Sequence, residues 1–315
     1  MKILITGGFG FIGGRLAKYL ASRGHKILLG SRIVRSHPEW GPCLEVVKTD
    51  WDNEDSLINL CRNVDAVIHS AGMNAYDCET NPVAALDFNG VSTSALVKAS
   101  CKAGVKKIIY FSTAHVYSSP FSGVLTEETC PANLHPYATS HLAGENAVLW
   151  AHQQKQIEGW IFRLSNSFGA PTHKNVNTWN LLVNDICRQA MVSKKIILKS
   201  NGTQYRDFVA LSSVEKTIEI SLLDSAPPSC NLIFNLGSGR PISIMAMAEL
   251  VAARYQNITG EQIRIEKVSD DANKAWQPFL VSVEKLKMSG LFFESINEPE
   301  IDELLLFCKR CFEKS

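Results

Sequence analysis

The chain has almost no net charge, and this limits its possible partners. Its 315 residues include 32 lysines and arginines against 31 aspartates and glutamates. Without an excess of one sign there is no overall field to attract nucleic acid or an anionic membrane, so we expect neither as a partner. No apolar run is long enough to span a bilayer, and glycines interrupt the apolar N-terminus, which argues against a signal peptide. We expect a cytoplasmic protein.

Closely spaced metal-binding or disulfide-forming residues are also scarce. The nine cysteines are scattered, and only Cys308 and Cys311 lie close together, in a predicted final helix without a second ligand pair. Two ordinary helix cysteines are the better interpretation. The eight histidines show no metal-ligand spacing with a carboxylate partner, so we expect no catalytic metal.

Repeats and low-complexity linkers are missing as well, while 45% of the residues are apolar and spread along the chain. A chain of this length can bury two domains' worth of core. With no linker between them, we expect two tightly packed, interleaved parts.

A glycine-rich turn opens the chain. An apolar strand at residues 2–5 runs into Gly7, Gly10 and Gly13, and Phe11 and Ile12 begin an amphipathic helix. The first glycine permits a tight turn, the second lets a ligand approach the backbone, and the third lets the helix lie close to the strand. With the free N–H groups of the helix N-terminus, this pattern predicts a pyrophosphate site.

Strands alternate with helices through the first half of the chain. Further strands are expected at 26–30, 44–48, 66–69, 107–112 and 160–164, and long helices at about 82–103 and 136–154. Strands this apolar are buried on both faces, so the fold class is α/β with a doubly wound parallel (Rossmann) sheet. Such sheets bind ligands at the carboxyl ends of their strands.

The pattern loosens in the second half. Helices are expected near 178–192, 213–224, 243–256 and 298–313, and short apolar runs occur at 195–199, 207–211, 232–236 and 263–267. We expect a dinucleotide-binding domain at 1–165, to which part of 205–230 returns. Residues 166–315 should form most of a smaller mixed α/β substrate-binding domain over the ligand edge of the sheet.

The end of the second strand lacks the carboxylate that would bind the adenosine ribose of NAD. Ser31 and Arg32 stand there instead, with Arg35 nearby, and a guanidinium can grip a 2′-phosphate. We therefore expect NADP as the cofactor, with NAD possible. The alternative is that Arg32 is a solvated surface arginine and either cofactor is accepted. Asp50 is placed to meet the adenine amino group.

Taken in order, these and later segments resemble the extended short-chain dehydrogenase/reductases. The similar branch acts on nucleotide-linked sugars as epimerases, dehydratases and 4-keto-reductases. The matching segments are 6–13, 50–51, 69–72, 89–93, 111–117, 136–137, 163–169, 206–209 and 235–239. The resemblance implies cofactor contacts from Trp51, Asn89 and Leu164, and small residues that let the dinucleotide pass at Ser70, Ala71 and Gly72.

The resemblance also implies a catalytic group, and here the chain departs from the family. Thr113 and Tyr137 stand at the family's Ser/Thr and Tyr positions, but His141 replaces the lysine that follows the tyrosine by four residues. That lysine binds the ribose and lowers the tyrosine pKa. Histidine has a reference pKa of about 6.5, against about 10.4 for lysine. His141 is protonated by its surroundings and replaces the lysine, or it relays protons itself, or the redox step is weakened or lost.

His115 is the second informative position. It follows Thr113 by two residues, so we expect the two side chains to share a face at the strand end. In the resembling branch this position carries a second acid or base where a sugar carbon is deprotonated. The alternative is a loop histidine that contacts substrate without proton transfer. Ala114 lacks the acid that a 4,6-dehydratase uses, which disfavours that reaction.

The remaining implied contacts concern the substrate. Arg206 stands where the family's arginine holds a nucleotide diphosphate, with a surface salt bridge as the alternative. The other expected substrate ligands are Asn74, Asn166 and Asn180. Related folds pair through two long helices, here 82–103 and 136–154, so we expect a homodimer.

The chain is therefore expected to be an NAD(P)-dependent epimerase or 4-keto-reductase of a nucleotide-activated sugar, serving polysaccharide or glycoconjugate precursor synthesis. One alternative is a carbonyl reductase of a non-sugar substrate. The other, motivated by His141, is a non-catalytic dinucleotide-binding protein.

Overall fold

A computed structural model describes residues 1–224, 231–268 and 278–312 of the chain. The chain folds into two compact units, each discontinuous in sequence. The first unit consists of Met1–Ser119, Glu127–Leu164 and Thr217–Asn235, and the second of Pro120–Thr126, Ser165–Lys216 and Leu236–Ser315.

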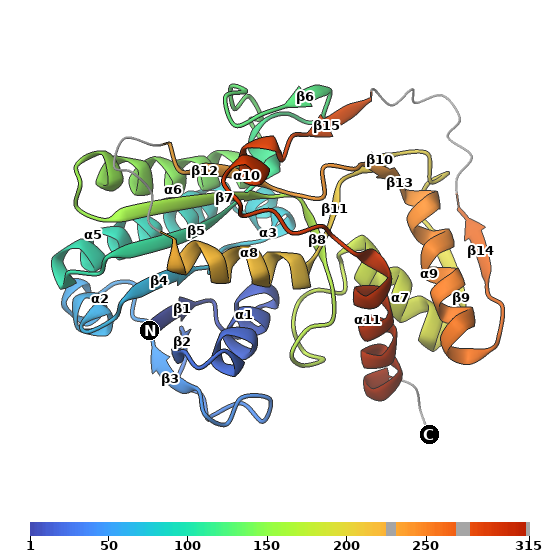
Figure 1. The fold of residues 1–315 in the computed structure, drawn as a ribbon, viewed down its shortest axis with the longest axis horizontal. Coiled ribbons are helices and arrows are strands. Elements are labelled where there is room, and N and C mark those ends of the chain that lie inside the picture. Colours follow the sequence, from blue (N-terminus) through green and yellow to red (C-terminus); the bar gives the residue numbers. More distant parts are fainter. Residues whose placement is uncertain (225–230, 269–277, 313–315) are drawn as a thin grey trace. The chain divides into compact units, whose positions relative to one another are not determined.

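A seven-stranded sheet forms the centre of the first unit (Figure 1). Its strand order is β12-β7-β5-β4-β1-β2-β3, and the pairs from β7 through to β3 are all parallel. The winding reverses between β1 and β4, so the carboxyl ends of these two strands form the switch point where such sheets bind ligands. The strands are β1 (Lys2–Thr6), β2 (Lys26–Ser31), β3 (Glu45–Lys48), β4 (Ala66–His69), β5 (Lys107–Thr113), β7 (Glu158–Leu164) and β12 (Ile233–Leu236). The predicted α/β class and parallel sheet are confirmed.

Helices cover this sheet because alternate strand residues point to opposite faces and nearly all are apolar. On one face, Leu4, Val67 and Ile108 share a core with Leu96 and Val148 of helices that lie side by side (Figure 1). The helices of this part of the chain are α1 (Phe11–Ser22), α2 (Glu54–Cys61), α3 (Ala75–Thr80), α4 (Pro82–Ala85), α5 (Thr93–Ala103), α6 (Pro136–Gln153) and α8 (Leu211–Leu223).

Two sequence expectations differ from the observed elements. The helix expected at 82–103 is three consecutive pieces, because a π-helical segment, η1 (Leu86–Ser92), separates α4 from α5. The apolar run 232–236 was expected in the smaller domain, and this is wrong, because β12 lies in the main sheet beside β7. Phe234 stacks there on Trp160 and Phe162, with ring centroids 5.4 and 5.8 Å away, which explains its preference for a sheet buried on both faces.

The second unit has its own core. Short strands pair as β8 (Asn166–Phe168) with β11 (Phe208–Ala210), β9 (Lys195–Leu198) with β14 (Arg264–Lys267), β10 (Tyr205–Arg206) with β13 (Ile242–Ser243), and β6 (Gly123–Leu125) with β15 (Phe279–Val281). Its helices are α7 (Leu182–Ser193), α9 (Ile244–Thr259), α10 (Glu284–Met288) and α11 (Asn297–Phe312). Buried Ile186, Met247 and Leu304 join α7, α9 and α11 in one cluster. Within the described residues no helix has the length and apolarity needed to cross a membrane.

Candidate functional site

The glycine turn has the geometry that a dinucleotide requires. Gly7 has φ +67°, and a Cβ there would lie 2.7 Å from the backbone nitrogen of Ala71, so only glycine fits. A Cβ on Gly13 would lie 2.5 Å from the carbonyl oxygen of Gly7, which explains how α1 packs so closely on the turn. Phe11 and Ile12 begin α1, whose N-cap, Gly10, supplies no side-chain hydrogen bond. The first N–H groups of the helix therefore remain for an anionic ligand, and the turn fits a pyrophosphate.

The end of β4 borders the same turn. The Ser70 hydroxyl donates a 2.7 Å hydrogen bond to the carbonyl oxygen of Thr6, which ties β4 to β1 at the switch point. Gly72 is exposed, and a Cβ there would lie 3.4 Å from Asn89 Oδ1 and 3.9 Å from His141 Nε2. Ser70 and Ala71 therefore lie against the glycine turn, whereas Gly72 lies beside Asn89 and His141.

Asn89 has a different environment from the one expected of a cofactor ligand. Its buried side chain accepts a hydrogen bond from the Met73 N–H at 2.8 Å and donates one to the Ser140 hydroxyl at 3.0 Å. These bonds connect η1 with the loop after β4 and with α6. Asn89 therefore holds these segments together from within the protein.

Two arginines stand near the end of β2. Ser31 is buried, whereas Arg32 and Arg35 are exposed, with guanidinium carbons 5.5 Å from the centroid of Phe88 and 4.8 Å from that of Phe9. Both are cation–π geometries, so the two charged groups are held against apolar rings rather than paired with carboxylates.

The adenine side of the predicted site follows β3. Asp50 forms a 3.4 Å ion pair with Lys48 at the surface. Trp51 packs against His69 and Phe88, with centroids 5.8 and 5.5 Å away, and its buried indole nitrogen has no hydrogen-bond partner among the described residues. A buried N–H normally finds a partner, so this group is open to a ligand acceptor.

Thr113 and Tyr137 lie near each other at the carboxyl edge of the sheet. Thr113 ends β5, and Tyr137 is the second residue of α6, where its backbone N–H donates to the ring of His135, the residue that caps the helix. Burial raises the pKa of Tyr137, and the neighbouring Thr113 side chain opposes that rise. A phenol and a threonine hydroxyl thus meet at the carboxyl edge of the sheet.

His115 does not lie where strand alternation placed it. The chain turns into a 3₁₀ segment, η2 (Ala114–Val116), directly after Thr113, and the expectation of a shared strand face is wrong. The turn forms because the Thr113 hydroxyl accepts the His115 N–H at 3.1 Å. The His115 ring is half-buried, with its centroid 6.5 Å from that of Tyr137, so it stays near the phenol by another route.

His141 lies one helical turn after Tyr137, and the two ring centroids are 4.6 Å apart. The side chain is buried, and burial lowers its pKa to about 4. Burial therefore opposes the interpretation in which the protein surroundings hold His141 protonated, because desolvation disfavours the imidazolium. Burial thus favours a neutral imidazole at the position where the resemblance implies a lysine.

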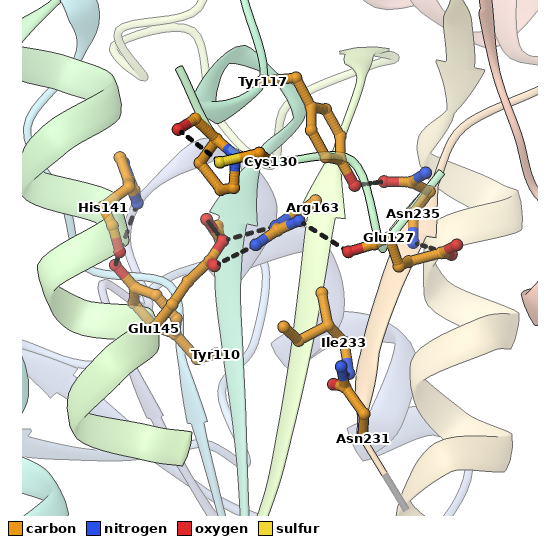
Figure 2. Close-up of polar contacts among 12 residues, drawn as sticks. Tyr110, Tyr117, Glu127, Cys130, His141, Glu145, Arg163, Asn231, Ile233 and Asn235 are labelled. Carbon is orange, nitrogen blue, oxygen red and sulfur yellow. Dashed lines mark hydrogen bonds and ion pairs between the residues drawn. The ribbon is translucent and has the colours of Figure 1, made fainter. Parts of the chain in front are cut away.

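The sequence did not reveal a buried ion pair beside this site. Arg163 on β7 forms a bidentate contact with Glu145 on α6, with nitrogen–oxygen distances of 3.0 and 2.7 Å (Figure 2). The Ser112 hydroxyl donates to the same carboxylate. The Arg163 guanidinium also lies 4.9 Å from the Tyr117 ring centroid. Burial opposes the charge of Arg163, yet Glu145 raises its pKa above the usual range. A glutamate four residues after His141 was the available signal, but only the fold shows which cation it meets.

The proposed substrate ligands fall in both units. In the first, Asn74 caps α3, accepting from the Asp77 N–H and donating to its carboxylate, so its side chain is already engaged. In the second, Asn166 donates to the backbone of Asp207 at 3.0 Å, and Asn180 is exposed. Arg206 is half-buried, and burial lowers its pKa. Its guanidinium donates a 3.1 Å hydrogen bond to Gln204.

Leu164, the remaining expected cofactor contact, ends β7 and is buried. Across the described part of the chain, no group of three or more histidine, cysteine, aspartate or glutamate side chains is arranged to hold a metal ion.

Known proteins share both the sequence and the fold. A UDP-glucose 4-epimerase of Azospirillum brasilense is 26% identical over 280 residues, which cover 83% of this chain and 78% of that protein. A putative UDP-glucose 4-epimerase of Methanocaldococcus jannaschii is 27% identical over 255 residues, which cover 79% of this chain and 81% of that protein. The structure of MoeE5 in complex with UDP-glucose and NAD superposes with a TM-score of 0.79 at 21% identity, covering 98% of this chain and 99% of that one.

The family comparison agrees with these relatives and with the geometry above. The sequence profile of the NAD dependent epimerase/dehydratase family matches residues 3–237, which include the glycine turn, Thr113, Tyr137 and Arg163. The resemblance inferred from the motifs is thereby confirmed: the chain belongs to the NAD dependent epimerase/dehydratase family.

Proposed function

We propose that this protein is an NAD(P)-dependent enzyme that epimerises, or reduces at a keto group, a sugar carried on a nucleotide. The observation that carries the proposal is the meeting of Tyr137 and Thr113 at the carboxyl edge of a sheet whose first turn fits a dinucleotide. Several relatives of similar length are named UDP-glucose 4-epimerase, which supports a nucleotide sugar as the substrate class.

Tyr137 and Thr113 act on the oxygen of the reacting sugar carbon. The nicotinamide, when bound, supplies the site that accepts or donates the hydride. Tyr137 takes the hydroxyl proton as the carbon is oxidised and returns it on reduction, while Thr113 holds the same oxygen by a hydrogen bond. His115 is near enough to the phenol to contact the substrate and is our candidate for moving a proton on a neighbouring carbon.

The state of His141 sets the pH at which this chemistry runs. Burial raises the pKa of Tyr137, and the neutral imidazole of His141 does not offer the full positive charge that would lower it. The tyrosinate fraction therefore grows with pH above neutrality, so the oxidative direction should speed up toward alkaline pH. Reduction needs the protonated phenol and should not share this rise.

The second unit contributes the proposed phosphate ligand. Arg206 is a half-buried cation whose pKa is lowered by burial, and a bound diphosphate would return the charge partner that it lacks in this environment. Arg206→Lys keeps the charge but loses the fork, so we expect a higher KM with a smaller effect on kcat.

For the cofactor, we propose that NADP is accepted and that Arg32, with Arg35, binds its 2′-phosphate. Both guanidiniums are exposed, and each lies against an aromatic ring that restricts its orientation. Arg32→Ala should weaken NADP binding more than NAD binding, as measured by isothermal titration. Equal losses for both cofactors would assign Arg32 to the surface instead.

We also propose a homodimer formed through the surface of η1 and α6. Val91 on η1 and Trp150 on α6 are exposed apolar residues, 58% and 64% accessible. Sedimentation of the wild type and of Trp150→Glu measures the assembly directly, and a wild type that sediments as a monomer contradicts it.

The catalytic proposal is tested by incubating the purified protein and either cofactor with a panel of UDP-, GDP-, dTDP- and CDP-sugars. A product with unchanged cofactor identifies an epimerase, and net oxidation of the reduced cofactor identifies a reductase. Tyr137→Phe should lower kcat by a factor of about 10² to 10⁴, the usual loss of a general acid–base group. Tyr117→Phe, which removes a buried hydroxyl bonded to Asn235, is the control. Cofactor binding without turnover across the panel would contradict the proposal.

A further inference from the structure

A buried contact between Tyr110 and His141 explains how an imidazole is held at the position of the family's lysine. Tyr110 on β5 points toward α6, and its hydroxyl oxygen lies 3.0 Å from Nδ1 of His141 (Figure 2). Both side chains are buried, at 1% and 7% exposure. The contact therefore forms where water cannot compete for either group.

The available hydrogens decide the direction of this bond. Burial raises the pKa of the Tyr110 phenol well above its ordinary value, so the phenol keeps its single hydrogen. Two acceptors face it on His141: the ring nitrogen at 3.0 Å and the backbone oxygen at 3.4 Å. The shorter contact to a free ring lone pair is the better hydrogen bond. When the phenol donates to Nδ1, the single proton of the neutral imidazole must lie on Nε2.

The surrounding residues keep the phenol in this place. Gly144 lies one turn along α6, where a Cβ would be 2.5 Å from the Tyr110 hydroxyl oxygen, so the helix is hollowed at the point where the phenol enters. On the other side His69 stacks on the Tyr110 ring at a centroid distance of 5.5 Å. The ring is thus confined between β4 and α6, and its hydroxyl reaches His141.

The tautomer of His69, which stacks on Tyr110, can be assigned from its hydrogen-bond partners in the same way. The Thr93 hydroxyl donates to the carbonyl oxygen of Asn89 at 2.7 Å, so it must accept from Nε2 of His69 at 2.9 Å. Nδ1 of His69 then accepts from the Thr6 hydroxyl at 2.6 Å. His69 is thereby also an Nε2–H imidazole, and burial is the main reason that its pKa falls to about 3.

We propose that Tyr110 is a positioning residue that fixes His141 as the Nε2–H tautomer, with this N–H directed to the backbone after β4. Gly72 lies on that side, and a Cβ built on it would be 3.9 Å from Nε2. His141 thus offers one fixed, uncharged donor where the family's lysine offers a charged one. The assignment of that donor to the cofactor ribose rests on the proposed function; the tautomer does not.

The test is nitrogen NMR of the full-length protein labelled with ¹⁵N-histidine, at pH 7.5. His141→Gln identifies the His141 signals by their loss. We expect an unprotonated Nδ1 and a protonated Nε2 in the wild type. In Tyr110→Phe the ratio of the two tautomers should shift about three- to tenfold toward Nδ1–H, the effect of one lost buried hydrogen bond. Tyr117→Phe removes a comparable buried hydroxyl, bonded to Asn235 at 2.6 Å, and should leave the His141 signals unchanged.

Two results would overturn the proposal: a protonated Nδ1 in the wild type, or a Tyr110→Phe spectrum in which the His141 signals do not move. The wild-type measurement decides alone if Tyr110→Phe fails to fold. The NAD dissociation constant of Tyr110→Phe should rise about threefold or more, while that of Tyr117→Phe stays within error. A protein that turns over no nucleotide sugar would refute the proposed function and leave the tautomer result standing.

Discussion

Two buried contacts between β5 and α6 provide a polar side chain of the helix with a hydrogen-bond partner. One contact is between neutral groups, and the other includes a charged pair. Tyr110 meets His141 in a hydrogen bond between neutral groups (Figure 2). Ser112, two residues further along the strand, meets Glu145, which forms a full ion pair with Arg163. His141 and Glu145 are four residues apart and therefore neighbours on one helix face.

The difference shows why a carboxylate near a histidine does not always raise the histidine pKa. Glu145 engages Arg163 with both oxygens and also accepts from Ser112, so its charge is balanced locally. His141 has only a phenol at Nδ1, and burial alone sets its pKa. A carboxylate close to a histidine in sequence is thus a poor guide to whether that histidine is protonated. What matters is whether the carboxylate is already paired with another cation.

The largest expected effect comes from breaking the charged contact. Glu145→Ala leaves the Arg163 guanidinium buried without its partner and should lower the free energy of unfolding by about 3–5 kcal/mol. Urea denaturation at pH 7.5 measures this. Glu266→Ala removes the partner of Lys195 in an ion pair whose two side chains are about half exposed, and should cost less than about 1 kcal/mol. The double variant Glu145→Met with Arg163→Met should recover most of the lost stability. If it does not, the loss in Glu145→Ala is not explained by the unpaired charge of Arg163 alone.

The next largest effect should be a loss of stability at acidic pH, caused by the buried neutral histidines His69 and His141. The pKa values of His69 and His141 are lowered by burial to about 3 and about 4, below the ordinary value near 6.5. The unfolded chain binds these two protons below pH 6.5 and the native protein does not, so stability falls as pH drops through that range. Each histidine contributes about 1.4 kcal/mol per pH unit, or together about 4 kcal/mol between pH 8 and pH 5.

Denaturation at a series of pH values tests this prediction. His141→Gln should remove about half of the slope that the two histidines cause. An unchanged slope would mean that His141 is already protonated in the native protein.

Adding a side chain at Gly144 of α6, where the helix faces the Tyr110 hydroxyl, should have a smaller effect. Alanine is normally favoured over glycine in a helix, but a Cβ at position 144 would lie 2.5 Å from the Tyr110 hydroxyl. Gly144→Ala should therefore destabilise the protein by about 1–3 kcal/mol through overpacking. In the Tyr110→Phe background the nearest clashing atom is gone, but the Cβ would still lie 2.8 Å from the ring carbon Cζ and from the backbone oxygen of Asn89, so the same change should cost somewhat less. Additive effects of the two substitutions would contradict the proposed role of Gly144.

The smallest expected effect is at Ser112. Its hydroxyl donates to a carboxylate that keeps both bonds to Arg163, so Ser112→Ala should cost about 1.5 kcal/mol, the low end for a hydrogen bond to a charged group. Ser22→Ala, at an exposed serine, serves as the control and should change stability by less than about 0.5 kcal/mol. A loss as large as that of Glu145→Ala would mean that the three-residue cluster fails as one unit.

Local patterns were enough to predict most of the fold. The glycine turn and the buried strands follow from periodicity and from motif spacing within short segments, whereas the Thr113–Tyr137 pair was implied by the resemblance to the family. The misplaced features depend on contacts between distant residues. β12 joins the main sheet because Phe234 stacks on Trp160 and Phe162, and Glu145 is neutralised by a residue on another strand. His115 left its expected face because one hydroxyl caps the turn after β5.

The return of the chain to its first sheet has a practical consequence for dissection. A fragment that stops at residue 165 would lack β12 and would leave β7 as a bare edge with Trp160 and Phe162 uncovered. An unpaired, apolar edge strand recruits other chains. The nucleotide-binding half should therefore aggregate when cut at the apparent boundary, and only a fragment that carries residues 231–236 as a grafted strand would restore its missing border.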